Sequence, residues 1–445
     1  MNKINTIDNS ISYRKIALSA CFGTFLEWYD FLTFATLAVI FGPLFFPSTD
    51  PNSGLLASLA TFGAGMVVRP IGAAIFGSMG DRIGRRPVFL ITITLMGLAT
   101  LSVGFLPTYA SIGILAPILL VMLRLMQGLS AGGEIGGSAV YLTEHAGSEN
   151  RGFKTSFLQL MGPLGVLAST LQIAFLQNYL SPEQFQEWGW RVPFWCSLPL
   201  LLIAYKVRMS LEETPIFLML QQEEKTAKNP LLNNLLDRDT RKKMFLLFFC
   251  VSAGGSVLFF CVQVYSAIFL KSSLGLSPQV VDKLCIWGTL TLFPLTIFSG
   301  WLSDRVGRRP LIIGGLALGS ILIQPAFWLL QTLALRTATE LDASHQLFMA
   351  LVLAALAIPL ALVIGPQTAL LAELFPAKTR NSAATLPHNL AAGWIGGLLP
   401  FAVTWLNHQL GNDLGGLWYP TIFLTCAAIL ATLYLPETNK TILLH

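Results

Sequence analysis

Long apolar runs separated by short polar segments follow one another along the whole chain. A helix needs about 20 mostly apolar residues to cross a lipid bilayer, and twelve runs reach roughly that length. In chain order they cover residues 16–46, 54–76, 88–106, 112–142, 153–179, 192–209, 244–270, 284–302, 311–331, 346–372, 382–406 and 415–435. The pattern therefore predicts an all-α membrane protein with twelve transmembrane helices.

The twelve runs form two sets of six, separated by a charged and polar stretch. This stretch, residues 210–243, is the predicted boundary between an N-terminal six-helix bundle over 1–209 and a C-terminal six-helix bundle over 244–445. We expect it to be a partly amphipathic, cytosolic linker. Two equal sets of helices predict two pseudo-symmetric bundles.

A short basic loop occurs once in each predicted bundle. Residues 77–87 read G-S-M-G-D-R-I-G-R-R-P and residues 300–310 read G-W-L-S-D-R-V-G-R-R-P, with seven of the eleven positions identical. The aspartates of the two copies, Asp81 and Asp304, lie 223 residues apart, about half of the chain. Such a repeat indicates a duplicated unit. Cytosolic loops collect Arg and Lys in any membrane protein, but that preference does not explain the matched aspartate, glycines and proline.

Two further segments match between the halves. Glu144 precedes Arg151 by seven residues after the fourth run, as Glu373 precedes Arg380 after the tenth. After the sixth and twelfth runs stand the related sequences Leu211-Glu212-Glu213-Thr214 and Leu435-Pro436-Glu437-Thr438. Both matches support two halves of common design, as in transporters built from parallel repeats.

The composition agrees with a membrane protein. Hydrophobic residues make up 54% of the chain and charged residues 11%, with a mean hydropathy of +0.65, whereas soluble domains carry roughly 25% charged residues. The first apolar run is far longer than the roughly 7–15-residue core of a cleaved signal peptide. We therefore expect the first helix to be retained.

The distribution of Lys and Arg predicts the orientation. If both termini are cytosolic, the inner loops and tails hold 22 of the 28 basic residues and the outer loops hold four. This bias favours that topology. The net charge of +5 then reflects the sidedness of the chain, and no aromatic-interleaved basic patch indicates a nucleic acid partner.

Five ionisable residues lie within predicted spans, namely Glu27, Asp30, Arg69, Arg124 and Glu134. A charge at the centre of a bilayer costs at least about 2.5–3.5 kcal/mol on insertion scales, so these side chains must line a cavity or pair with one another. Glu27 and Asp30 are three residues apart and share a helix face.

These charges have two interpretations. In the functional one, Arg124 anchors an anionic group of a solute, Glu27 and Asp30 carry protons, and Glu134 is a further candidate. Arg69 belongs to the solute-binding residues, and its long side chain could reach Glu27. In the structural one, the same residues form a buried ion-pair network that holds the first, second and fourth helices together. Hydrophobic packing could replace such pairs at little cost, so their presence favours the functional interpretation.

Aromatic and polar side chains in the spans complete the candidate site. Trp28 and Tyr29 could hold a quaternary ammonium group by cation–π attraction or simply pack in the core. Tyr265 and His388 could supply the second half's share of the site, or could make interhelical hydrogen bonds. Glycines repeat every four residues at Gly128, Gly132 and Gly136, a spacing that lets membrane helices approach closely.

Several short runs together carry a family resemblance. They are Glu27-Trp28-Tyr29-Asp30-Phe31, Arg69-Pro70-Ile71-Gly72, Ala116-Pro117, the run from Arg124 through Gln127-Gly128 to Gly132-Gly133-Glu134, Trp188-Gly189-Trp190-Arg191-Val192-Pro193-Phe194, and the two basic loops. Over its whole length the chain resembles the major facilitator superfamily. Over residues 20–215 it resembles the metabolite:proton symporters, which include proline/betaine, citrate, 2-oxoglutarate and shikimate carriers. Gln127 of this run joins the candidate solute site.

The resemblance implies that the basic loops are gates. Asp81 would face the start of the eleventh helix and Asp304 that of the fifth, where a carboxylate gains typically 0.3–1 kcal/mol from the helix dipole. Such contacts between halves would form when the cytosolic side is closed. The implied gating residues are Asp81, Arg82, Arg85, Glu144, Arg151, Asp304, Arg305, Arg308, Glu373 and Arg380.

We expect a secondary active transporter of the bacterial inner membrane, a functional monomer in the lipid bilayer that takes up a small organic solute together with a proton. A carboxylate metabolite is favoured; a zwitterion such as proline or betaine is the alternative, as is a uniporter or antiporter of the same fold. The sequence holds no nucleotide-binding loop and no hydrolase or zinc-protease motif. We therefore expect neither an enzyme nor a cofactor or metal site.

Overall fold

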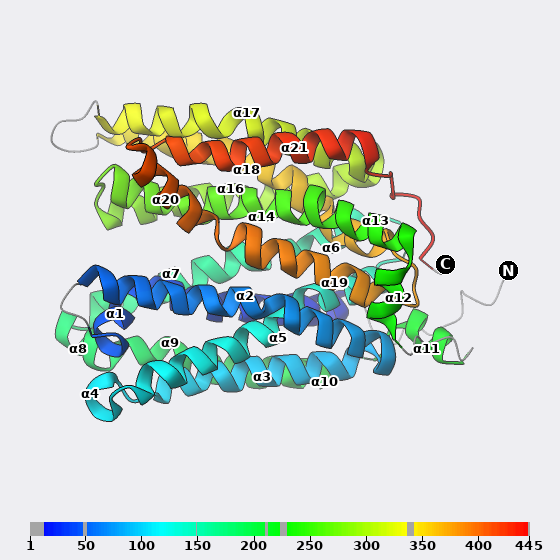
Figure 1. Ribbon diagram of the computed structural model, residues 1–445, viewed down its shortest axis with the longest axis horizontal. Coiled ribbons are helices and arrows are strands. Elements are labelled where there is room, and N and C mark those ends of the chain that lie inside the picture. The colour runs from blue at the N-terminus through cyan, green and yellow to red at the C-terminus, as the bar shows by residue number, and fades with distance from the viewer. Residues whose placement is uncertain are drawn as a thin grey trace.

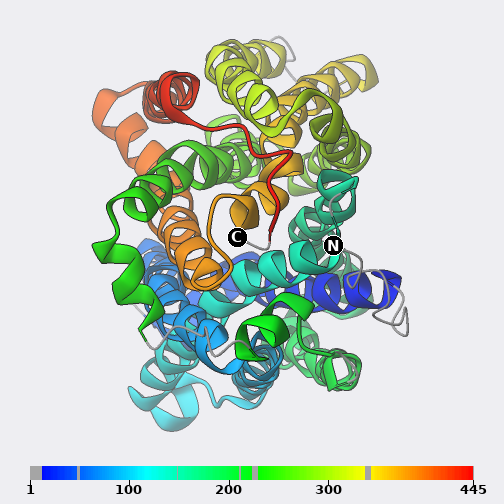
Figure 2. The same cartoon turned by 90° about the vertical axis from the view of Figure 1, so that its right-hand side faces the viewer.

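The computed structural model describes residues 13–47, 51–147, 149–209, 212–222, 229–335 and 342–443. These residues form helices that lie side by side in two groups, with the described ends of the chain at one end of the molecule (Figure 1). Seen from that end, the first half of the chain occupies one side and the second half the other (Figure 2).

The first bundle contains the helices up to Met209. They are α1 (Tyr13–Phe45), α2 (Pro51–Ile83), α3 (Arg85–Phe105), α4 (Tyr109–Ile112), α5 (Leu115–His145), α6 (Arg151–Gln159), α7 (Met161–Tyr179), α8 (Pro182–Glu187), η1 (Gly189–Arg191), α9 (Val192–Trp195) and α10 (Ser197–Met209).

Two short helices, α11 (Pro215–Gln222) and α12 (Pro230–Leu236), lie in the connecting stretch. The second bundle consists of α13 (Arg238–Leu246), η2 (Leu247–Ala253), α14 (Gly254–Phe259), η3 (Phe260–Tyr265), α15 (Ser266–Ile268), η4 (Phe269–Ser273), α16 (Pro278–Val306), α17 (Arg308–Leu335), α18 (Ala343–Glu373), α19 (Arg380–Leu390), η5 (Ala391–Gly396), α20 (Leu399–Leu410), η6 (Gly415–Leu417) and α21 (Trp418–Tyr434). Its first membrane segment begins at Arg238, inside the stretch predicted as linker.

The helices match the predicted spans. Eleven segments of the described chain are long and apolar enough to cross a membrane, and the first predicted span coincides with the 33-residue helix α1. The all-helical, two-bundle prediction is therefore confirmed. Within it, the fifth span is divided at Leu160, and the seventh and eleventh contain π-helical turns. Turns of this kind are frequent at functional sites.

The first bundle is packed tightly through glycine. A Cβ atom at Gly128 would overlap the carbonyl of Gly65, and one at Gly132 would overlap that of Arg69, so the backbones of α2 and α5 touch. At Gly136 the neighbour is instead Thr385 of the second bundle. The predicted packing role of this glycine repeat is confirmed, and it extends to the contact between bundles.

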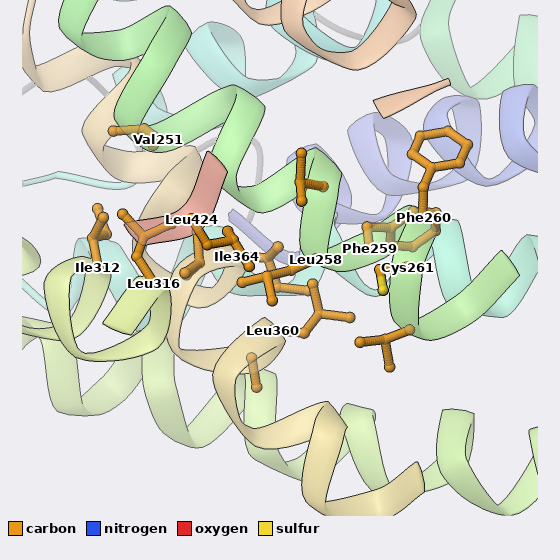
Figure 3. Close-up of a cluster of buried hydrophobic side chains, with 14 of the residues drawn as sticks. Val251, Leu258, Phe259, Phe260, Cys261, Ile312, Leu316, Leu360, Ile364 and Leu424 are labelled. Carbon is orange, nitrogen blue, oxygen red and sulfur yellow. The ribbon is translucent and has the colours of Figure 1, made fainter. Parts of the chain in front are cut away.

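The second bundle has an apolar core. Figure 3 shows aliphatic and aromatic side chains gathered between the helices, among them Leu258, Leu316 and Leu360. Each of these three side chains is fully buried. Away from its basic loop, the end of α18 and the start of α19, the described part of this bundle has no buried Asp, Glu, Lys or Arg side chain, in contrast to the interior of the first bundle.

Candidate functional site

Each basic loop joins the two bundles through a clamp of two carboxylates and two arginines. We call the end of the molecule that holds them the basic end. The first clamp consists of Asp81, Arg85, Glu144 and Arg380, and the second clamp of Asp304, Arg308, Glu373 and Arg151.

The aspartates cap a helix of the opposite bundle. Asp81 accepts hydrogen bonds from the backbone N–H groups of Asn381 and Ser382, at 3.1 and 2.8 Å. Asp304 likewise accepts from the backbone N–H groups of residues 152–153, both at 2.8 Å. These donors belong to the first turns of α19 and α6, which have no acceptor within their own helices. Each carboxylate therefore satisfies otherwise unpaired groups and meets the positive end of the helix dipole.

In the first clamp, Glu144 is shared between the bundles. One of its oxygens lies 3.3 Å from Nη2 of Arg85 in its own bundle and 3.0 Å from Nη1 of Arg380 in the other. All three side chains are buried. Buried ion pairs are held only with several well-placed donors, and this carboxylate has two.

In the second clamp, Glu373 has the same position. Its Oε1 lies 3.3 Å from Nη2 of Arg308 and 2.8 Å from Nη1 of Arg151 in the first bundle, and its Oε2 accepts a hydrogen bond from Thr438 at 2.7 Å. The clamps are thus formed and the bundles are closed at the basic end. Two predicted gating residues do not join them: Arg82 is exposed, and Arg305 lies 3.8 Å over the ring of Trp301.

Two glutamates that were not predicted as site residues fix the basic loops. Glu213 accepts from the backbone N–H groups of residues 85–86, both at 3.0 Å, and Glu437 accepts from those of residues 308–309, at 2.9 and 3.1 Å. The matched segments after the sixth and twelfth runs were the signal that could have identified them.

The same loops need glycine at one position. Gly84 and Gly307 have φ values of 105° and 111°, in a region of backbone space that other residues rarely adopt. A side chain at either position would also collide with the carboxylate of the glutamate that caps its loop. The duplicated geometry thus extends to individual backbone angles.

Further into the molecule, a cavity of about 60 Å³ lies between the bundles, which is room for roughly two water molecules. Its described lining contains no Asp, Glu, Lys or Arg side chain. The lining residues are Thr24, Trp28, Ile135, Leu158, Gln159, Gly162, Gly255, Ser256, Phe259, Phe260, Ile364, Gln367, His388 and Ala392.

Two of the predicted solute-binding residues, Trp28 and His388, line this cavity. The ring of Trp28 lies 5.2 Å from that of Phe259 across the bundle interface. His388 contacts Ser252 through Nδ1 at 3.1 Å and the amide of Gln367 at 3.4 Å. The amides of Gln159 and Gln367 were not predicted. Both are polar residues within predicted spans, and that was the available signal.

Beside the cavity, Glu27 and Arg69 form a buried ion pair, with 2.6 Å between Oε1 and Nη2. The prediction that Arg69 reaches Glu27 is thus confirmed. The Arg69 guanidinium also lies 6.0 Å from the ring of Trp28 and 5.7 Å from that of Phe31. Since Thr24, one turn before Glu27, lines the cavity, the ion pair lies next to it.

Asp30 and Arg124 lie in a second, enclosed cluster. Arg124 is fully buried, with its guanidinium 4.3 and 4.2 Å from the rings of Phe31 and Phe34, and it donates to Gln127 at 2.9 Å. Asp30 interacts with it electrostatically. The Asp30 carboxylate also meets the hydroxyl of Thr100, and among the described residues two nitrogens of Arg124 have no hydrogen-bond partner. Neither residue belongs to the cavity lining.

Glu134 lies in a third cluster, paired with Arg208 of α10. Both carboxylate oxygens of Glu134 bind this guanidinium, one of them at 2.9 Å, and Oε2 also accepts from Thr92 at 3.1 Å. Arg208 is 1% exposed, although it lies at the end of the sixth predicted span. Its pairing with Glu134 of α5 depends on the packing of α10 against α3.

The two predicted tyrosines make hydrogen bonds within their own bundles. Tyr29 donates to the carbonyl of Pro193 at 3.0 Å and also contacts Gln172, and Tyr265 accepts from Asn407 at 2.9 Å. Neither belongs to the cavity lining. Among the described residues no group of three or more His, Cys, Asp and Glu side chains could hold a metal ion.

Comparison with known proteins gives consistent matches along the chain. The family model described as "Sugar (and other) transporter" matches residues 16–244 and 231–443. The inner membrane metabolite transport protein YhjE of Escherichia coli is 35% identical over 95% of this chain and 94% of its own length. The shikimate transporter of Escherichia coli is 33% identical over 90% and 89%. The proline/betaine transporter of Salmonella typhimurium is 32% identical over 90% and 79%.

Among solved structures, the proton:xylose symporter XylE of the major facilitator superfamily, bound to 6-bromo-6-deoxy-D-glucose, superposes with a TM-score of 0.75. It is 20% identical and covers 98% of both chains. At this identity the likeness concerns the fold, which is that of the major facilitator superfamily.

Proposed function

Because the chain belongs to the family of sugar and other transporters, we propose that it carries a small organic solute together with a proton across the bacterial inner membrane by alternating access. Membership in this family makes the chain a transporter rather than an enzyme. The finer statement is supported by two clamps that join the bundles at one end and by a small cavity between them that is lined in part by Gln159, Gln367 and His388.

The basic end faces the cytosol in this proposal. The distribution of Lys and Arg supports this orientation. The closed clamps then form the cytosolic gate, and the structure represents a state that is shut on the inside. A cavity of about 60 Å³ is far smaller than the roughly 300–1,000 Å³ of typical ligand sites, so the bundles must move apart before a solute enters.

The Glu27–Arg69 pair is the observation that carries the proton-coupling proposal. It lies beside the cavity, 2.6 Å apart and buried, and breaking a buried pair from one side leaves a costly uncompensated charge. Proton uptake by Glu27 is therefore expected to change the energy of the surrounding contacts strongly. Asp30 and Glu134 remain further candidates for proton carriers.

The solute would first meet the side chains that line the cavity. Gln159, Gln367 and His388 offer hydrogen bonds, and Trp28 and Phe259 offer aromatic surface. Arg124 would bind a solute carboxylate in another state of the transporter, in which Phe31 and Phe34 no longer cover its guanidinium. Relatives named for shikimate and for proline/betaine support a carboxylate as the first candidate and a zwitterion as the alternative.

Transport in proteoliposomes tests this proposal. A panel of carboxylates and betaines is offered under an imposed proton gradient, with the voltage clamped by valinomycin. We expect accumulation that requires the gradient. Glu27→Gln should lower this accumulation by at least about tenfold, while Glu183→Gln, at an exposed position of α8, should have no effect. A monoanion transported with one proton moves no net charge across the membrane. A zwitterion transported with one proton moves one elementary charge, and the membrane potential then contributes about 2.3 kcal/mol per 100 mV to its uptake.

Uptake that equilibrates equally well without a gradient would identify a uniporter. Uptake that requires solute on the opposite side would identify an antiporter. Either result would overturn symport.

A further inference from the structure

Asn389 of α19 is a second-bundle residue whose side chain is bound to the first bundle. Its amide nitrogen donates to the carbonyl of Gly132 on α5 at 2.8 Å and to that of Thr385 in its own helix at 3.0 Å. Its carbonyl oxygen accepts from Nε of Arg69 on α2 at 3.2 Å. The side chain is fully buried, so breaking these bonds without replacement would be costly.

Arg69 is therefore shared between two acceptors of different bundles. Nη2 binds Glu27 of α1 at 2.6 Å while Nε binds Asn389. Nε and Nη2 form one edge of the planar, rigid guanidinium. Because the guanidinium is rigid, the bond from Nη2 to Glu27 also sets the direction of Nε, and so determines whether Nε can donate to Asn389.

The contact lies level with the cavity, since His388 and Ala392 on either side of Asn389 line it. Asn389 is eight residues beyond Asn381, whose backbone N–H binds Asp81 of the first clamp, about 12 Å along a helix. A change at Asn389 thus acts on a contact between the bundles that must break when they separate.

We propose that Asn389 is a positioning residue that transmits the charge state of Glu27 to the second bundle. This inference rests on the proposed proton coupling. Ionised Glu27 holds Arg69 in place and so keeps α19 bound to α2. Once Glu27 takes up a proton, Arg69 loses its counterion and reorients, the bond to Asn389 breaks, and α19 is released for opening at the basic end.

Other charged groups lie near Glu27 and could also contribute to a pH response. Glu134 of α5 and Arg208 of α10 interact with it electrostatically, Asp30 lies one turn away on α1, and His388 of α19 lies near Arg69. If the pH response belongs to Glu27, then Glu27→Gln removes it, whereas neutralising the other groups leaves it in place.

The test measures the separation of the bundles directly. Spin labels at Lys206 and Lys242, two exposed residues at the basic end of opposite bundles, report it by pulsed EPR in a cysteine-free background. We expect acidification to shift the wild type toward longer distances. Asn389→Ala should abolish this pH response and lower proton-driven accumulation about tenfold, with solute exchange in the absence of a gradient retained.

Asn407→Ala is the matched control, since Asn407 is a largely buried asparagine that bonds within the second bundle; it should keep the pH response. Arg69→Lys removes the same hydrogen bond by changing its donor, because lysine keeps a positive charge for Glu27 but has no Nε donor for Asn389. Should Asn389→Ala not fold, Asn389→Ser and Arg69→Lys carry the same expectation.

A normal pH response in Asn389→Ala, or in both substitute variants, would overturn the inference. Absence of a pH response and of proton-driven uptake in the wild type would instead overturn the proposed function.

Discussion

The two bundles are alike at the clamps but differ in their interiors. Each holds a clamp of the same composition, a loop glycine with the same backbone angle and a glutamate that caps the loop. Away from the clamps, the buried Asp, Glu, Lys and Arg side chains of the described spans all belong to the first bundle, and they are Glu27, Asp30, Arg69, Arg124, Glu134 and Arg208.

The difference between the interiors suggests that closing the basic end and holding a proton place different demands on the two bundles. Closing one end of the molecule needs contacts from both bundles, so both copies of the clamp are useful. Holding a proton requires an ionisable group in one place, and away from the clamps the costly buried charge of the described spans is confined to the first bundle. The second bundle then has to sense the first, and Asn389 is the contact proposed for that purpose.

The largest effect is expected from removing one partner of the buried pair in the first bundle. Arg69→Ala leaves Glu27 as an unpaired buried charge and should cost about 3–5 kcal/mol, seen as a large fall in Tm. Lys271→Ala breaks an exposed pair of the second bundle, which is 2.8 Å long, and should cost at most about 1 kcal/mol. Replacing both Glu27 and Arg69 by Gln should restore most of the Tm but not transport. Equal losses from Arg69→Ala and Lys271→Ala would contradict the contrast between the bundles.

The clamps should respond alike. Asp81→Asn and Asp304→Asn each weaken charge-assisted hydrogen bonds to a helix start, worth about 1.5–3 kcal/mol, and should shift the spin-label distances toward separation by similar amounts. The two changes should add, because the clamps share no residue. A single dominant clamp would show that the duplicated gate is not used symmetrically.

The loop glycines sharpen the same comparison. Gly84→Ala and Gly307→Ala force a side chain into a backbone region that costs about 1–3 kcal/mol and against a capping glutamate. Both should lower the Tm similarly and loosen the closed state. Gly314→Ala, at a helical position where a Cβ atom meets nothing within 4 Å, is the control and should leave the Tm unchanged or slightly higher.

The smallest effect on uptake is expected at the carboxylate whose partner bonds within the first bundle. Arg208 donates to Glu134 and to the carbonyl of Phe89, whereas Arg69 also binds the second bundle, so Glu134→Gln should lower proton-driven uptake less than Glu27→Gln, by under about tenfold. Uptake assays on the two variants at matched expression measure this difference. A larger loss at Glu134 would make Glu134, and not Glu27, the principal proton site.

The sequence by itself determined the number and approximate positions of the spans, the division into two halves, and the clamp residues. Hydropathy can be read from the sequence segment by segment. The basic loop occurs once in each half, so the two copies are expected to make equivalent contacts. It also identified Glu27, Asp30, Arg69, Arg124 and Glu134 as charges that must avoid lipid.

Only the tertiary structure decided what these charges touch. The sequence placed Arg124 in a solute site, but packing encloses it between phenylalanines; Arg208 proved to be the partner of Glu134, and the cavity is lined instead by residues such as Gln159 and Gln367. Asn389 meets Arg69 across 320 residues of chain. These contacts depend on how separate helices pack against each other. The periodicity of residues along one helix does not specify that packing.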